Sequence, residues 1–156
     1  MSQSKGETIM SENTKSWLLF LSRFFMGGMF LITGLRKSIG LFGAGGFAGS
    51  SKFVASTMGV SMDIAQVLLA LACALEIIAG IMLIVGYRTK LAAIGLIIFV
   101  IILSPIFHGP WNFQMPRAMN EFDQMLKNLN LIGCMLLYLA FGPGSMSMDA
   151  RAGRRN

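Results

Sequence analysis

The sequence predicts an all-α membrane protein, a four-transmembrane-helix bundle with a short interfacial helix in the first loop. Of its 156 residues, 54% are hydrophobic and only 13% are charged, whereas soluble domains carry about 25% charged residues. Four apolar stretches are long enough for a bilayer core, which needs about 20 helical residues. Open strands are excluded as spans because lipid cannot satisfy the hydrogen-bonding groups at their edges.

The chain divides into a flexible polar N-terminus at 1–15, a membrane domain at 16–149 and a basic C-terminal tail at 150–156. Within the membrane domain the spans are expected at residues 17–37, 64–86, 90–107 and 125–142. The first span could instead be a cleaved signal peptide. We expect it to remain, because it is longer than a usual signal sequence, Arg23 interrupts it, and no small-x-small cleavage site ends it.

The connections between the spans differ in character. The first is rich in glycine and then carries apolar side chains through FAGSSKFVASTMG, which favours a short helix lying at the membrane interface. A tight basic turn at 86–90 follows the second span. Pro105 and Pro110 are expected to end the third span, and residues 110–123 to form a polar, aromatic loop.

The basic residues predict an orientation. Four spans place both termini on one side, which carries seven of the lysines and arginines at or beyond the span ends, against five on the other. We therefore expect both termini in the cytoplasm. The pI near 9.8 is explained by basic edges that face anionic lipid headgroups, so no nucleic-acid partner is predicted.

Two ionisable residues lie inside the spans, each on a face that also carries glycine. Arg23 shares a helix face with Gly27, Gly34 and Lys37, and Glu76 shares one with Gly80. The three glycines are expected to let these helices pack closely. A charge at membrane depth costs at least about 2.5–3.5 kcal/mol, so we predict that Arg23 and Glu76 form an ion pair.

Two roles remain open for this predicted pair. It could be a structural tie that sets the register of the two helices. Alternatively, Glu76 could be a proton-responsive or ligand-binding carboxylate, since ionisable groups inside membranes are functional candidates by default.

A second polar group is expected toward the opposite membrane face. Lys37 ends the first span, His108 ends the third, and Lys127 and Asn128 open the fourth. These four residues could rim one pocket, although a histidine at a helix end can also be a capped interfacial residue. No metal site is predicted, because one histidine without nearby cysteine or aspartate lacks metal-ligand spacing. Cys73 and Cys134 form no C-x-x-C pair and are expected to behave as small hydrophobic residues.

Several motifs together resemble the DoxX family over residues 17–149. The first span carries R-x3-G-x2-F-x3-G-x2-K at Arg23–Lys37, and the second carries E-x3-G-x2-L-x2-G-x2-T-x2-A-A at Glu76–Ala93. His108, the pair Lys127–Asn128 and the closing GPGSMSMD at 142–149 complete the pattern. The stretch GLFGAGGFAGS in the first loop departs from the family.

The resemblance implies a small four-helix protein of the bacterial inner membrane that works beside the quinone pool. The sequence carries no haem-ligand pair, flavin fingerprint or dithiol, so we expect no intrinsic cofactor and a redox centre in a partner or a bound quinone. The expected partners are the lipid bilayer and membrane or periplasmic subunits or further copies of the chain. The first hypothesis is therefore a non-catalytic accessory or anchoring subunit of a redox-related complex. The alternatives are a quinone-binding oxidoreductase subunit and a pathway for small solutes or protons.

Overall fold

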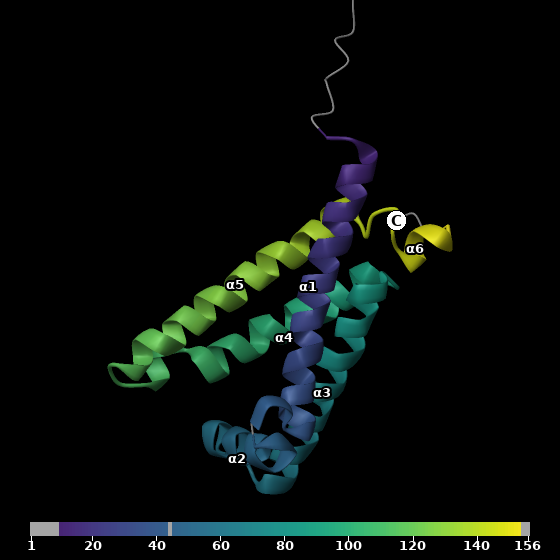
Figure 1. The fold of residues 1–156 in the computed structure, drawn as a ribbon. Helices are drawn as coiled ribbons and strands as arrows, with labels where there is room; N and C mark the ends of the chain where they lie inside the picture. Colours follow the sequence, from purple (N-terminus) through teal and green to yellow (C-terminus); the bar gives the residue numbers. More distant parts are fainter. Residues whose placement is uncertain (1–9, 44, 154–156) are drawn as a thin grey trace, which may run out of the picture.

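The computed structural model describes residues 10–43 and 45–153, and every regular element among them is a helix (Figure 1). Four helices are long and apolar enough to cross a membrane: α1 (Glu12–Ile39), α3 (Met62–Val85), α4 (Thr89–His108) and α5 (Arg117–Phe141). The shorter ones are η1 (Leu41–Gly43), α2 (Gly46–Met58), η2 (Pro110–Asn112) and α6 (Met148–Arg151). The predicted fold class is confirmed, and α2 is the short helix expected in the first loop.

Helices α1 and α3 pack backbone against backbone. A Cβ atom added to Gly80 would lie 2.7 Å from the carbonyl oxygen of Gly27, and one added to Gly34 would lie 3.3 Å from the carbonyl oxygen of Cys73. As residue numbers rise along α1 they fall along α3, so the two helices are antiparallel. Small residues give such close approach in membranes, where dispersion contacts between helices replace the hydrophobic effect.

The core has two parts. Side chains of α1, α3, α4 and α5 form the larger cluster, which is centred on Leu83, Leu96, Met135 and Tyr138. A smaller cluster lies between α2 and α3. Helix α2 also contacts α4, since the rings of Phe53 and Phe107 lie 5.8 Å apart between centroids. In Figure 1, α4 and α5 run beside each other and diverge from the α1–α3 pair toward their joined ends.

The largest difference from the predicted spans is the start of the fourth. Helix α5 begins at Arg117 and not near residue 125, so residues 117–123 form its first turns and not a loop. Their charges hide them from a hydropathy scan, but Arg117 and Glu121 form an i, i+4 pair with Nε 3.4 Å from Oε1, which supports a helix. Helix α4 continues through Pro105 to His108, so it matches the span predicted at 90–107 to within one residue at each end.

The ends of the chain are described only in part. Helix α1 already begins at Glu12, inside the segment expected to be flexible, and α6 takes in the start of the expected tail. Residues 1–9 and 154–156, which belong to those two predicted segments, lie outside the described residues.

Candidate functional site

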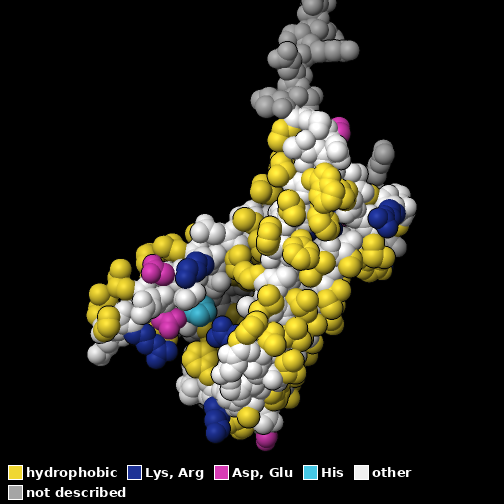
Figure 2. All heavy atoms as spheres, viewed as in Figure 1, with side chains coloured by type: hydrophobic (Ala, Val, Ile, Leu, Met, Phe, Trp, Pro, Cys, Tyr) yellow, Lys and Arg dark blue, Asp and Glu magenta, His cyan; other side chains and the backbone are white. Residues whose placement is uncertain are grey.

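A cavity of about 1280 Å³ lies among α1, α2, α3, α4 and α5. Figure 2 shows the molecule hollowed beside the α5 arm, where basic, acidic and histidine side chains gather at the rim. The walls are mainly apolar. The polar lining includes residues from four of these helices, namely Lys37, Glu76, Ser104, His108, Glu121, Lys127, Asn128 and Asn130.

A salt bridge between α1 and α3 lies on the cavity wall. Lys37 Nζ donates a hydrogen bond to Glu76 Oε1 at 2.7 Å and lies 2.6 Å from Oε2. The Glu76 side chain is 6% exposed and that of Lys37 is 33% exposed. Lys37 Nζ also lies 5.9 Å from the centre of the Phe99 ring, a cation–π contact that supports the charge away from water.

Arg23 does not contact Glu76, so the ion pair predicted from the sequence is not formed. The Arg23 guanidinium binds the carbonyls of Leu83 and Ile84, seven and eight residues beyond Glu76 and so about 10 Å further along α3 at 1.5 Å per residue.

The direction in which helical side chains lean explains why Glu76 pairs with Lys37 and not with Arg23. They lean toward the N-terminus of their own helix. In this antiparallel pair, Lys37 and Glu76 therefore lean toward each other, whereas Arg23 and Glu76 lean apart.

A second ionic group lies at the rim of the cavity. His108 Nδ1 is 2.8 Å from Glu121 Oε2, and Arg117 Nε donates to Glu121 Oε1 at 3.4 Å. The Arg117 guanidinium lies 4.2 Å from the centre of the Phe113 ring. Sequence reasoning missed Glu121 because it placed this residue in a loop. Its i, i+4 spacing from Arg117 is the signal that could have found it.

The remaining predicted pocket residues come from the first half of α5. Asn128 Nδ2 donates to the hydroxyl of Ser104 on α4 at 3.0 Å, which ties the two helices together. Lys127 is exposed at the cavity edge. The structure therefore places Lys37, His108, Lys127 and Asn128 around one cavity and adds Glu76 to them.

Arg23 belongs to a different site, at the end of the bundle where α1 begins. Its side chain is fully buried, and its Nη2 donates to the carbonyl of Met146 at 2.6 Å. A Cβ atom on Gly86 would overlap the guanidinium, so only glycine leaves room for it there. Arg23 thus fastens the segment after α5 to the end of α3.

The same segment is held by Asp149. Its two carboxylate oxygens accept hydrogen bonds from the backbone N–H groups of Arg88 at 2.8 Å and Thr89 at 2.9 Å. Its own N–H donates to the carbonyl of Gly86 at 2.9 Å. Asp149 therefore caps α4 from a distant part of the chain, because the first N–H groups of a helix have no partner within it.

Asp149→Asn is expected to lower the free energy of unfolding by about 1–2 kcal/mol, the range for losing a helix cap. One oxygen remains as an acceptor, but the charge and the second acceptor are lost. Thermal unfolding in detergent micelles measures this loss. Asp63→Asn is the matched control, because Asp63 is an exposed residue of the first turn of α3. Equal melting temperatures of the two variants would contradict the capping role.

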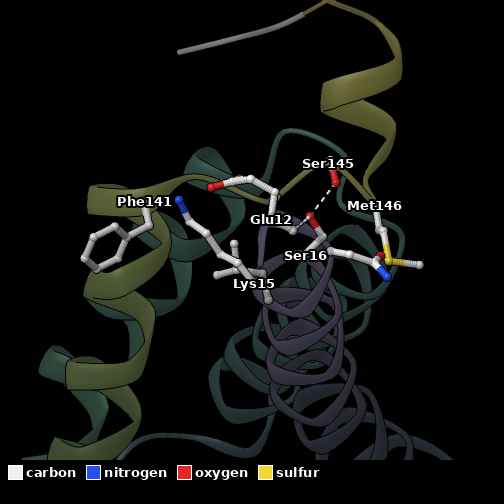
Figure 3. A pocket seen from close by; sticks show the side chains of 9 residues that line it. Glu12, Lys15, Ser16, Phe141, Ser145 and Met146 are labelled. Carbon is white, nitrogen blue, oxygen red and sulfur yellow. Dashed lines mark hydrogen bonds between the residues drawn. The ribbon is translucent and has the colours of Figure 1, made fainter. Parts of the chain in front are cut away.

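A smaller pocket of about 350 Å³ lies at this end of the bundle. Figure 3 shows Ser16 of α1 facing Ser145 of the segment after α5, with 2.6 Å between their hydroxyl oxygens. This pocket lies where the start of α1 meets the segment after α5. The larger cavity holds the paired ionisable groups and is therefore the candidate binding site.

The arrangement in the large cavity suits a molecule with a polar head and an apolar body. Lysine, histidine and amide groups line the cavity together with apolar side chains, among them Leu68 and Leu69 of α3. Among the described residues, no three or more histidine, cysteine, aspartate or glutamate side chains are grouped as a metal site. Cys73 is buried and Cys134 is exposed, and both are free thiols.

Comparison with known proteins identifies relatives for most of the chain. A family model described as DoxX matches residues 18–109. The inner membrane protein YphA of Escherichia coli (strain K12) is 27% identical over 134 residues, which cover 86% of this chain and 89% of that protein. The Surfeit locus protein 4 homolog of Drosophila melanogaster is 32% identical over 73 residues, 44% of this chain and 26% of that protein. No solved structure matches.

Proposed function

The chain belongs to the DoxX family of integral membrane proteins, and on this premise we propose that it is a non-catalytic subunit that holds a quinone-class molecule for a redox complex in the same membrane. The observation that carries the proposal is the cavity of about 1280 Å³ beside the Lys37–Glu76 salt bridge. The family resemblance supports the redox setting, and the cavity supports the binding.

The lining of the cavity fits the two parts of such a ligand. A quinone head carries two carbonyl acceptors, and Lys37, Lys127 and Asn128 offer N–H donors. Its isoprenoid tail needs an apolar wall, which the α3 side of the cavity supplies. Ligand pockets commonly combine apolar walls with a few placed polar groups.

The proposal assigns binding and not chemistry to this chain. Four of the ionisable groups at the cavity are already paired, since Lys37 pairs with Glu76 and His108 lies beside Glu121. The redox centre would then belong to a partner subunit.

The location of the partner follows from the expected orientation. The name of the Escherichia coli relative supports an inner membrane, and the lysine and arginine count supports cytoplasmic termini. The end of the cavity with Lys37 and His108 lies where α1 and α4 finish, so it would open toward the periplasm. A partner that exchanges the quinone would therefore dock on that face.

Ala72→Trp is expected to weaken binding of a short-chain ubiquinone at least tenfold. Ala72 lines the cavity, and an indole there would occupy the space for the head or tail. Radiolabelled ubiquinone-1 added to the protein in lipid nanodiscs measures the affinity. Ala74→Trp is the matched control, because Ala74 is exposed on the same helix and does not line the cavity.

A second variant tests the polar end of the site. Glu76→Gln keeps the shape of the side chain but leaves the Lys37 ammonium without its counter-ion, so the same assay should report altered ubiquinone-1 affinity. Unchanged affinity in both Ala72→Trp and Glu76→Gln, with both proteins folded, would remove the cavity from the proposal.

A further inference from the structure

One face of α5 carries polar side chains along the exposed surface of the bundle. Asp123, Lys127, Asn130 and Cys134 follow one another at i, i+4, i+7 and i+11, and all four are exposed. This spacing places them on a single stripe of the helix. Of the four spans, α5 is the least covered, with 11% of its most apolar window buried against 28–33% in the others.

The stripe is costly if it faces lipid. Among the described residues, none of these four side chains makes a hydrogen bond or an ion pair. Asn130 lies 13 residues from the start of α5, which is about 20 Å along the helix and within the apolar part of the span. Leu126, Leu129 and Leu137 beside the stripe are exposed and apolar. A polar group at this depth without a partner is unfavourable by about 1–3 kcal/mol on the scale of protein mutations.

We propose that the stripe is the contact surface for a second copy of this chain, with α5 of one copy packed against α5 of the other. Copies of one protein insert in the same direction, so the two-fold axis of such a dimer stands perpendicular to the membrane. The two α5 helices are then parallel, and equal residues meet at equal depth.

Under this symmetry, the charges on the stripe of one copy are complementary to those on the stripe of the other. Asp123 and Lys127 lie one turn apart, so Asp123 of each copy reaches Lys127 of the other. The Asn130 amides meet and can exchange hydrogen bonds, as paired asparagines do between parallel helices. Asp123, Lys127 and Asn130, which have no partner among the described residues of the single chain, each gain one of fitting chemistry.

The interface lies beside the cavity, since Lys127 and Asn130 line it as well. A second copy would therefore cover the mouth of the cavity along α5. The dimer does not depend on what the cavity binds, so its test is separate from the quinone assay.

The exposed thiol of Cys134 provides the test. A short bismaleimide added to native membranes is expected to join Cys134 of the two copies and to give a covalent dimer on a denaturing gel. Cys134→Ser should abolish the product, which assigns it to this thiol and not to the buried Cys73. The matched control is Cys134→Ser with Leu136→Cys, because Leu136 is exposed but about 200° around the helix from the stripe. We expect at least tenfold less dimer from it.

Charge exchange distinguishes a specific interface from random encounters. Asp123→Lys should lower the yield of the Cys134 dimer several-fold, because lysines then face one another. Adding Lys127→Asp should restore the yield. The proposal is overturned if Cys134 reacts with a monofunctional maleimide but gives no more dimer than the Leu136→Cys control. It is also overturned if Cys134 joins a different protein, or if the charge variants give equal yields.

Discussion

Arg23→Met is expected to destabilise the bundle by about 3 kcal/mol or more, since each buried polar group that loses its partner costs about 1–3 kcal/mol. The guanidinium is fully buried and binds the carbonyls of Leu83, Ile84 and Met146. Methionine fills much of the volume but donates no hydrogen bond. Thermal unfolding in micelles measures the loss of stability.

Hydrogen exchange shows which part of the structure opens more readily in Arg23→Met. The backbone N–H of Asp149, which donates to the carbonyl of Gly86, should exchange faster because the segment after α5 loses its attachment. Arg36→Met removes an exposed arginine from the same helix and should leave both stability and this exchange unchanged. If the two variants unfold at the same temperature, the attachment does not depend on Arg23.

Gly27→Leu is expected to separate α1 from α3 and to cost about 3 kcal/mol, the upper end of the range for overpacked sites. A Cβ atom at Gly27 would overlap the carbonyl oxygen of Gly80 and lie 2.8 Å from Cγ1 of Ile84. Because backbone atoms block the space, no rotamer change can make room. The free energy of unfolding in mixed micelles measures the effect.

The neighbouring glycine supplies the control for this prediction. A Cβ atom at Gly28 meets nothing within 4 Å, so Gly28→Leu should be neutral or slightly stabilising, because glycine is a poor helix former. Similar losses at both positions would show that the tight contact between α1 and α3 does not determine stability.

For the Lys37–Glu76 pair, the sequence predicted the helix faces that carry the two residues but not their contact. The faces were predictable, because residues at i, i+4, i+7 and i+11 share one side of a helix whatever it packs against. The partner of Glu76 was not predictable, because Arg23 and Lys37 lie on the same face of α1. Which basic residue pairs with Glu76 depends on the antiparallel register of the two helices and on the direction in which each side chain leans. Neither can be read from the sequence.

The start of α5 is the second feature that a hydropathy pattern could not give. The charges of Arg117, Glu121 and Asp123 favour a loop in a hydropathy scan, so the contact of Glu121 with His108 was not predicted. A hydropathy scan reports only apolar length, whereas the helix here is supported by an i, i+4 ion pair and by packing against α4.

The sequence by itself determined that four helices cross the membrane, which faces carry glycine, and which few residues are ionisable within the spans, because lipid imposes length and composition on every spanning segment. Only the tertiary structure decided that Glu76 pairs with Lys37, that Arg23 holds the segment after α5, and that Glu76, His108 and Lys127 line one cavity. The physical reason is that a pattern fixes the face of a helix, whereas contact between two faces depends on register, direction and the path of the chain between them.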